Sequence, residues 1–232
     1  MANEKILSAT KANNLFWLGR YESRVYMTLH LMNKVFDKMI DGSPADYMDL
    51  WNKLDMTGIY DTPEAFTLGM LYDEDNPSSL ISSQRLAMDN AILLREDIMS
   101  ETLSYLEMST AMLRKCKAAG ETNISQLQSV VDWSLAFWGS AEQRTHNVRA
   151  IVLMILGRNV ELMDMLIRFG YPYKRVEVAF GAVKRYAKDV PEMVDENILA
   201  HVEAMFVPDQ YEPDSDEYKY TLLKYVNQIA RV

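Results

Sequence analysis

The chain is poor in the residues that end helices and in those that bind metals or form disulfides. Its 232 residues include only 9 glycines, 7 prolines, 3 histidines and 1 cysteine. So few glycines and prolines favour long helices joined by few loops. A lone cysteine, Cys116, cannot form a disulfide within the chain, a pattern typical of reducing compartments. We therefore expect a helical, cytoplasmic protein.

An excess of basic residues and long apolar runs are also missing. The net charge is −9, from 24 basic and 33 acidic residues, whereas phosphate binding needs a basic face. No run of about 18 or more apolar residues occurs, and the first residues, MANEKILSATK, lack the apolar core of a secretory signal. We expect neither a nucleic-acid partner nor association with a membrane.

Common cofactor and metal motifs are absent as well. The chain has no Walker loop, no GxGxxG after a strand, no GxSxG and no CxxC. A carboxylate-bridged di-metal bundle needs histidines three residues after glutamates. Glu142 precedes His146 by four residues and Glu196 precedes His201 by five. We predict no metal site and no cofactor.

Apolar residues recur every three to four positions through most of the chain, and no stretch alternates convincingly with period two. This pattern predicts an all-α, single-domain bundle of about six to eight helices over residues 1–232. An acidic connector at 207–217 precedes the last helix. The predicted helices cover about 8–40, 62–75, 77–117, 124–138, 142 or 147 to 169, 173–188, 191–206 and 217–231.

One segment occurs twice. LFWLGRYESRVYMTLHL (15–31) aligns without gaps to LMILGRNVELMDMLIRF (153–169), with identical leucines, glycine, arginine and methionine at five positions. This similarity predicts an internal duplication whose two helices pack as a pseudo-symmetric pair. Gly19 and Gly157 share one register, and glycine inside a helix is costly unless two backbones approach closely there.

A carboxylate interrupts the apolar seam of the first copy. Leu15, Leu18, Val25 and Leu29 follow the seam, and Glu22 stands where the second copy has Val160. An ionised carboxylate left unpaired among core residues is very costly. We therefore expect Glu22 to be paired, protonated or open to a cavity.

Further charges lie beside the two seams, on both copies of the repeat. One interpretation is a buried polar network that fixes helix register. The other is a polar pocket between the helices that holds a ligand or a reacting group. In the second interpretation the candidate catalytic residues are Glu22, Arg24 and Glu161. The candidate ligand-binding residues of these helices are Arg20, Arg24, Arg158, Glu161 and Asp164.

The segment NPSS (76–79) resembles a helix start, with Asn76 as the cap and Pro77 in the first turn. Its exposed amides, together with Ser78 and Ser79, could hold an anion. The alternative is an ordinary capped helix end.

A polar set follows on the same predicted helix. Asn90 lies in line with Ala87 and Leu94, so we expect its amide to be buried and to need partners. Arg95 and Glu96 follow one turn later. The set forms either an internal hydrogen-bond network or, with NPSS, a site for phosphate or carboxylate.

Three motifs resemble the alpha-E domain family, bacterial all-helical proteins named for a helical "ER" motif. They are NLFWLGRYESRVY (14–26), NPSSLISSQRLAMDNAILLRED (76–97) and LGRNVELMD (156–164), in the order of the family. The resemblance covers residues 8–169. Charged positions of the family motifs are occupied here by Ser23, Tyr26, Met88, Ile92 and Leu162. Each repeat thus keeps one member of the ER pair, Arg24 or Glu161, and we expect the two to complete one ion pair.

The resemblance implies a helical domain of unknown activity. Such proteins are associated with ATP-grasp amide ligases and transglutaminase-like peptidases, in predicted systems that form or modify peptides. It therefore implies an accessory protein that acts through contacts with such a partner, with or without an anionic ligand. Two alternatives stay open: an enzyme with an acid–base pocket between the repeat helices, and a self-associating, homo-oligomeric scaffold without ligand.

Overall fold

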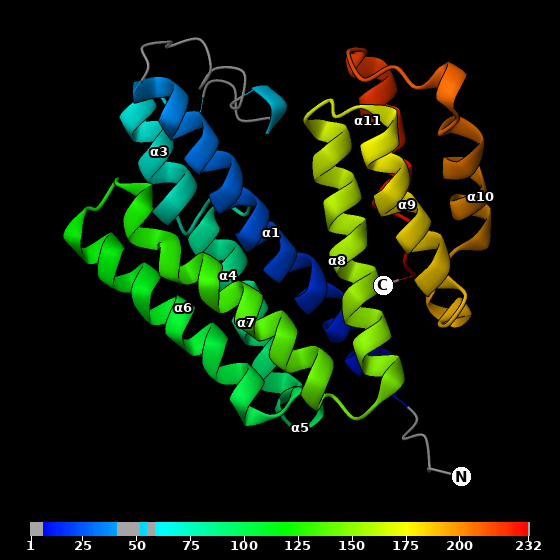
Figure 1. Ribbon diagram of the computed structural model, residues 1–232, viewed down its shortest axis with the longest axis horizontal. Helices are drawn as coiled ribbons and strands as arrows, with labels where there is room; N and C mark the ends of the chain where they lie inside the picture. The colour runs from blue at the N-terminus through cyan, green and yellow to red at the C-terminus, as the bar shows by residue number, and fades with distance from the viewer. Residues whose placement is uncertain (1–6, 41–51, 55–58, 232) are drawn as a thin grey trace. The chain divides into compact units, whose positions relative to one another are not determined.

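A computed structural model describes residues 7–40, 52–54 and 59–231 (Figure 1). Ten α-helices and three short 3-10 helices make up the regular structure of these residues, and no strand occurs among them. One isolated antiparallel bridge joins Val194 to Ala230. The prediction of an all-α fold is confirmed. The number of helices is larger than predicted, because some predicted helices are divided.

The first helices begin where local signals place them. α1 covers Ala9–Ile40. α3 covers Pro63–Tyr72, and the Thr62 hydroxyl accepts a hydrogen bond from the amide of Ala65 at 3.1 Å. Proline lacks a backbone N–H, and this costs nothing in the first turn of a helix, because an N–H there has no partner within the helix. Both helices agree with the sequence pattern.

The predicted helix over 77–117 is wrong. The structure divides this stretch into α4 (Leu80–Leu93), α5 (Arg95–Ile98) and α6 (Ser100–Ala119). α4 and α6 pack against each other as a helical hairpin, with α5 at its tip (Figure 1). α6 ends close to the predicted position, and Gly120 caps it with φ 63°, a left-handed conformation that suits glycine.

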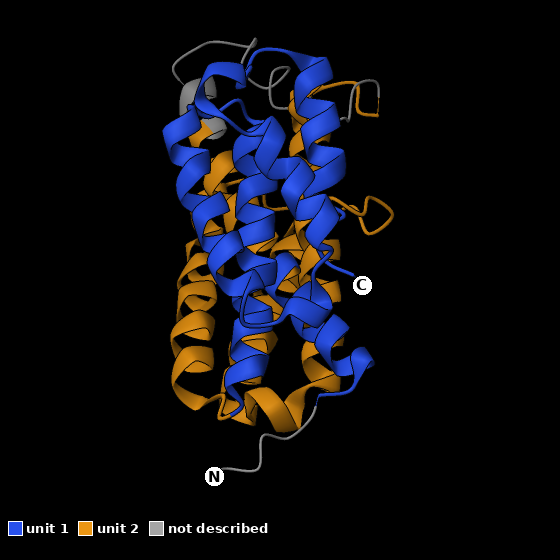
Figure 2. Cartoon of the chain, turned by 90° about the vertical axis from the view of Figure 1, so that its right-hand side faces the viewer, with its two compact units in different colours: residues 1–20, 147–232 blue, residues 21–146 orange. Residues whose placement is uncertain are grey.

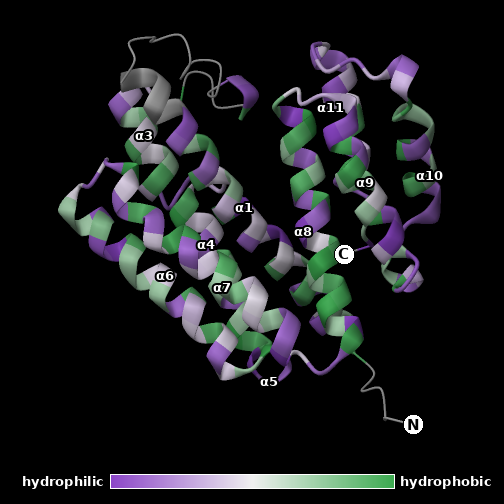
Figure 3. Ribbon diagram, viewed as in Figure 1, coloured by the Kyte–Doolittle hydropathy of each residue, from purple (hydrophilic) through white to green (hydrophobic). Residues whose placement is uncertain are grey.

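The predicted bounds of the helix over 124–138 are also wrong. A 3-10 turn covers Ile124–Leu127, and α7 then runs through Gly139 from Gln128 to Arg144. α8 covers Val148–Arg168 with Asn147 as its cap, which agrees with the later of the two predicted starts. Its cap oxygen accepts from the amides of Arg149 and Ala150. Buried residues line α8 over most of its length, and Figure 3 shows the hydrophobic colouring along it.

The C-terminal helices are shorter than predicted. α9 covers Tyr173–Ala187, α10 covers Glu196–Met205 and α11 covers Asp216–Val226. A 3-10 turn at Pro191–Met193 precedes α10, so the predicted helix over 191–206 begins late. Another at Pro208–Gln210 lies within the acidic connector. Among the described residues, no helix combines the length and the apolar content needed to cross a bilayer.

The chain forms two compact units, coloured separately in Figure 2. Unit 1 comprises residues 1–20 and 147–232, and unit 2 comprises residues 21–146. In unit 1, α8 packs on α9 and α11, and α10 packs on α11. In unit 2, α6 packs on α7 and α4, and α3 packs on α4. Residues of α1 up to Arg20 belong to unit 1, and the rest of the helix belongs to unit 2.

Both units have apolar cores built from the predicted seams. The buried side chains of unit 1 include Leu15, Leu18, Leu153, Leu156, Val160, Val176, Val183, Leu222 and Val226. Those of unit 2 include Val25, Leu29, Phe66, Leu80, Leu94, Leu106, Leu113 and Phe137. These positions follow the three-to-four-residue spacing of their helices, as burial of one helix face requires.

The two repeat glycines lie at a close crossing of α1 and α8 within unit 1. A Cβ atom added to Gly19 would overlap the carbonyl of Met154, and one added to Gly157 would overlap the carbonyl of Phe16. The predicted close approach at these glycines is confirmed. Each helix thus uses its glycine to receive the backbone of the other. An internal duplication of the two segments stays a prediction.

We expect Gly157→Ala to lower the free energy of unfolding by about 3 kcal/mol, because backbone atoms cannot move aside as a flexible side chain does. Gly139 is the matched control, since it is also helical and a Cβ atom there meets nothing within 4 Å. Gly139→Ala should raise the free energy of unfolding by up to about 1 kcal/mol through better helix propensity. Urea denaturation followed by circular dichroism measures both changes, and equal effects would contradict the close crossing.

Candidate functional site

Beside the glycine crossing of unit 1, Arg20 and Glu161 form a buried ion pair. The Arg20 side chain is 3% exposed and that of Glu161 1%. Nε and a terminal nitrogen of Arg20 lie 2.8 and 2.7 Å from Oε2 of Glu161. The guanidinium also lies over the ring of Trp17, 5.1 Å from its centroid. In a buried ion pair of this kind, well-directed hydrogen bonds as well as the attraction of opposite charges offset the cost of desolvation.

Asn227 extends this pair into a network that reaches the end of α11. Its side-chain oxygen accepts from Arg20 at 2.8 Å, and its amide nitrogen donates to Oδ2 of Asp164 at 2.6 Å. The other oxygen of Asp164 accepts from Nε of Arg168 at 3.1 Å. The network therefore joins α1, α8 and the C-terminal end of α11. Sequence analysis missed Asn227, because nothing near it in the sequence marks it as a partner of Arg20.

Glu22 lies in unit 2, buried in the seam where the sequence places it, with 1% exposure. Its Oε2 has no hydrogen-bond partner among the residues that the structure describes. Burial raises the pKa of Glu22 from 4.5 to about 7, and the nearby Ser134 hydroxyl of α7 opposes this shift only in part. Of the three expected states, the protonated one is therefore the one that this site favours up to about neutral pH.

Other predicted residues of the repeat helices lie nearer to the surface. Arg24 is half-buried, and its guanidinium lies 5.9 Å from the ring centroid of Tyr21. Arg158 is also half-buried. Glu161 forms an ion pair with Arg20, which lies one helical turn before Arg24. A pair between Arg24 and Glu161 stays a prediction.

The NPSS segment caps α4 with a different residue from the one predicted. Ser79 is the cap, fully buried, and its hydroxyl accepts from the amide of Ser82 at 3.1 Å. Asn76 instead closes the preceding turn by accepting from the amide of Ser78 at 2.9 Å. The Ser79 hydroxyl is thus already used within the chain, which favours the capped helix end over an anion site at this point.

The polar residues farther along this stretch also bond locally. Asn90 is half-buried rather than buried, and its amide donates to the carbonyl of Leu86 one turn earlier at 2.9 Å. Arg95 is exposed on α5 and donates from Nε to the Ser100 hydroxyl at 3.2 Å. Glu96 is exposed beside it. These residues therefore hold their own helices and turn.

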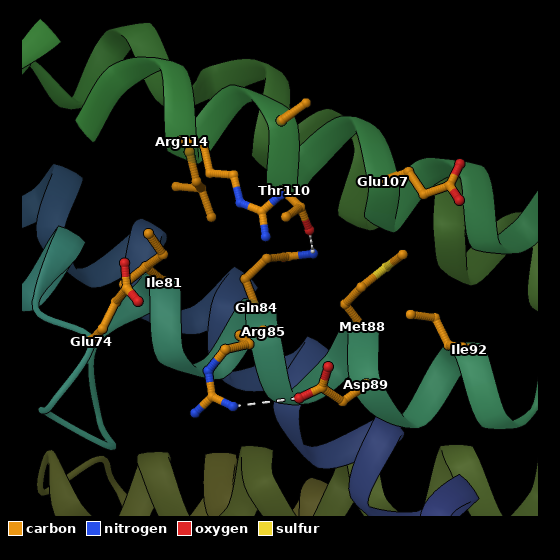
Figure 4. Close-up of a pocket in the computed structure, with 12 residues that line it drawn as sticks. Glu74, Ile81, Gln84, Arg85, Met88, Asp89, Ile92, Glu107, Thr110 and Arg114 are labelled. Atoms are coloured by element: carbon orange, nitrogen blue, oxygen red, sulfur yellow. Dashed lines mark hydrogen bonds and ion pairs between the residues drawn. The ribbon is translucent and has the colours of Figure 1, made fainter. Parts of the chain in front are cut away.

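A groove that sequence analysis missed lies between α4 and α6 of unit 2, with a volume of about 430 Å³ (Figure 4). Its walls combine apolar with charged side chains. The apolar and small residues are Ile81, Met88, Ile92, Ala111 and Leu113, and the charged ones are Glu74, Arg85, Asp89, Glu107 and Arg114. Sequence analysis predicted one straight helix over this stretch, and a groove between α4 and α6 exists only where the chain folds back into two helices.

Charges in the groove are paired to different degrees. Arg85 and Asp89 form an exposed pair on α4 at 3.4 Å, and Lys117 contacts Glu74 at 2.5 Å. The bond from Lys117 lowers the pKa of Glu74, and the charges of Arg114 and Arg85 lower it further. Arg114 has no ion pair among the described residues of the chain. The Glu74 end of the groove is therefore the more electropositive.

We expect Arg20→Ala to lower the free energy of unfolding by about 3–5 kcal/mol, because Glu161 would stay buried without its counter-charge. Arg85→Ala is the matched control in an exposed pair whose side chains are 54% and 58% exposed. That control should change the free energy of unfolding by less than about 1 kcal/mol. Urea denaturation at neutral pH measures both values. A loss of under 1 kcal/mol for Arg20→Ala would show that the network does not hold unit 1.

We also expect Glu22 to make stability depend on pH. Between its ordinary pKa of 4.5 and its folded-state pKa of about 7, the folded chain keeps a proton that the unfolded chain has lost. The free energy of unfolding therefore falls as pH rises through this window, by roughly 3 kcal/mol in total. Glu22→Gln has no proton to lose and should escape this fall.

Urea denaturation of wild type and Glu22→Gln at pH 4, 5, 6, 7 and 8, about one unit apart, measures the effect. The advantage of the variant should grow from pH 4.5 to 7 and then stay constant. Glu107→Gln, at an exposed position of α6, is the control and should follow wild type. A constant difference between Glu22→Gln and wild type at every pH would contradict the raised pKa.

Comparisons with known proteins place the chain in a family without adding a function. A family model described as a predicted alpha-helical domain with a conserved ER motif matches residues 7–202. Comparison with curated proteins and with solved structures gives no match. The matched range includes the glycine crossing, Arg20, Glu22, Glu161 and the α4–α6 groove. The chain belongs to the Alpha-E family.

Proposed function

We propose that this Alpha-E protein is an accessory protein that acts through protein contacts. The buried charges of Arg20 and Glu161 stabilise its own fold. The observation that supports this most directly is the burial of Arg20 and Glu161, at 3% and 1% exposure, in a bond with each other. A residue that binds a substrate needs at least one polar atom that the substrate can reach. The guanidinium instead donates to Glu161 and Asn227.

The network suits a structural role in detail. Arg20 donates through two nitrogens, and Asn227 connects it to Asp164. A planar guanidinium with directed donors fixes the register of two helices more strictly than apolar packing does. The closely crossed glycines leave little room for either helix to slide. This supports the interpretation of a buried polar network over that of a ligand pocket at Arg20 and Glu161.

The proposed contact surface is the α4–α6 groove of unit 2. Exposed Ile92 and half-buried Met88 offer apolar area, and Arg114 and Arg85 offer positive charge at one end. An acidic side chain or a terminal carboxylate next to apolar residues of a partner would complement this surface. The family association suggests an ATP-grasp amide ligase or a transglutaminase-like peptidase as the partner.

An enzyme is the second candidate, and Glu22 is the observation that favours it. A carboxylic acid that keeps its proton to about pH 7 has the pKa of a general acid. Its 1% exposure is the obstacle, because a substrate would need an opening between α1 and α7 to reach it. We therefore place the accessory role first.

We expect Arg114→Glu to lower recovery of the partner by about tenfold or more, because it sets like charges against each other at the groove. The wild-type chain and the variant, each tagged, are used as baits in native extract, and bound proteins are identified by mass spectrometry. Lys188→Glu makes the same charge change at an exposed position of unit 1 and is the control. It should recover as much partner as wild type.

Two results would overturn parts of this proposal. Recovery of neither an ATP-grasp ligase nor a transglutaminase-like peptidase by the wild-type chain would contradict the partner class. Equal recovery of such a partner by wild type and Arg114→Glu would contradict the groove as the contact surface.

A further inference from the structure

The chain reverses direction between α4 and α6 without any residue that favours a turn. From Leu80 to Ala119 it contains neither glycine nor proline. α4 nevertheless ends at Leu93, and α6 begins at Ser100 after the four-residue α5. The residues of this turn favour helix about as well as those on either side of it. Local preference therefore favours a straight helix, and tertiary packing imposes the hairpin.

Met99 bears the conformational cost of the reversal. It has φ 71° and ψ 151°, a backbone region that is essentially restricted to glycine. Among the described residues it is the one non-glycine residue with positive φ. In a straight helix Met99 would adopt the ordinary φ of an α-helix, about −63°. Straightening would therefore remove this strain.

The buried positions of the stretch fit a straight helix as well as a hairpin. A subset of them recurs at spacings of three and four through both breaks, which is the stripe that a long helix needs to pack. This subset is Leu80, Gln84, Ala87, Ala91, Leu94, Ile98, Thr102, Leu106, Ser109, Leu113 and Cys116, and Ser82, Ser83, Asp97 and Leu103 are buried beside it. One sequence thus supports two arrangements that differ at the turn.

A straight helix in a single chain would remove α4 from α6 and expose the surfaces between them. A second copy of the chain carries the same surfaces and can restore every contact. The amide of Gln84 donates to the carbonyl of Leu106 at 3.2 Å and to the Thr110 hydroxyl at 3.3 Å. With Gln84 from one copy and α6 from the other, these bonds form again without change.

The tip of the hairpin also carries apolar side chains that a second copy would cover. Ile92 is 52% exposed, Leu93 67% and Met99 37%. In two straight helices that cross near this point, these side chains would lie near the crossing and could face one another. New contacts at the former turn are a general feature of exchanged dimers, which bury more surface than two monomers.

We propose that two copies of this chain form a dimer by exchanging the segment before Met99. α4, α5 and α6 join into one helix of about forty residues, and α3 and α4 of each copy pack on α6 of the other. The inference is independent of the proposed partner, because it concerns how two copies complete each other's packing and not what binds to them. The exchanged segment includes α1, so the contacts of Gly19 and Arg20 with α8 would also form between the copies.

Zero-length cross-linking with a carbodiimide tests the exchange on the unmodified chain. The reagent joins the carboxyl group of Glu74 to the amine of Lys117, which lie 2.5 Å apart on opposite sides of the turn. In the hairpin the new amide bond lies within one chain, and in the exchanged dimer it joins two chains. Lys184 and Glu203, at 2.6 Å, both follow the turn and should always join within one chain.

Equal amounts of ¹⁴N and ¹⁵N chains are refolded together at high concentration, and the dimer is isolated by size-exclusion chromatography. We expect about half of the Glu74–Lys117 cross-linked peptides of the dimer to combine one light and one heavy chain, since refolding pairs the chains at random. Lys184–Glu203 peptides should stay unmixed. A dimer with unmixed Glu74–Lys117 peptides, or a chain that is monomeric even after concentrated refolding, would overturn the proposal.

Two variants at the turn provide a second test that does not use cross-linking. Ser100→Pro suits the first position of α6 but interrupts a straight helix. The equilibrium constant for dimer formation should therefore fall on the order of a hundredfold for each of the two chains, and the dimer fraction falls with it. Ser100→Ala is its control and should keep the wild-type dimer fraction. Met99→Gly relieves the strain of the hairpin. It should lower the equilibrium constant for dimer formation about tenfold for each of the two chains, and with it the dimer fraction.

Circular dichroism shows whether each variant is folded. If Ser100→Pro fails to fold, Met99→Gly decides the outcome, because glycine suits the observed conformation of the turn. A dimer fraction equal to wild type in folded Met99→Gly would contradict the exchange.

Discussion

The close contact between the backbones of α1 and α8 is the constraint from which the site of unit 1 follows. Because Gly19 and Gly157 each receive the backbone of the other helix, the neighbouring side chains must leave the crossing at its edges. Arg20 and Glu161 lie there, removed from water, and a charge in such a place needs a partner. Each supplies the partner of the other, and Asn227 adds the end of α11. A packing requirement thus produces the charge network.

Two buried acids of this chain meet the cost of desolvation in different ways. Glu161 is held beside a guanidinium. Glu22 is buried at the same level of exposure, and its pKa rises toward neutral pH. The first solution is specific in direction and joins helices, whereas the second leaves a neutral group whose cost depends on pH. The sequence alone shows that Glu22 interrupts an apolar seam but not which solution applies.

Sequence reasoning succeeded where one local signal decides the outcome. The start of α3 follows from Thr62 and the proline after it, and the glycine crossing follows from two glycines at one register. It failed where packing overrides propensity, because nothing near Met99 announces a turn. The pairing of Arg20 with Glu161 depends on helix rotation, which spacing leaves open. The α4–α6 groove could not be predicted once the hairpin was missed.

The enclosure of Arg20 and Glu161 changes where a function should be sought in this family member. A motif can be retained because its residues hold helices together, and retention then says little about ligands. The accessible features of unit 2 are of another kind: a groove with an electropositive end, and apolar side chains at the turn of α5. Both exist only because α4 and α6 fold back on each other. The hairpin that local propensity opposes therefore creates the surface that we propose for contacts with other proteins.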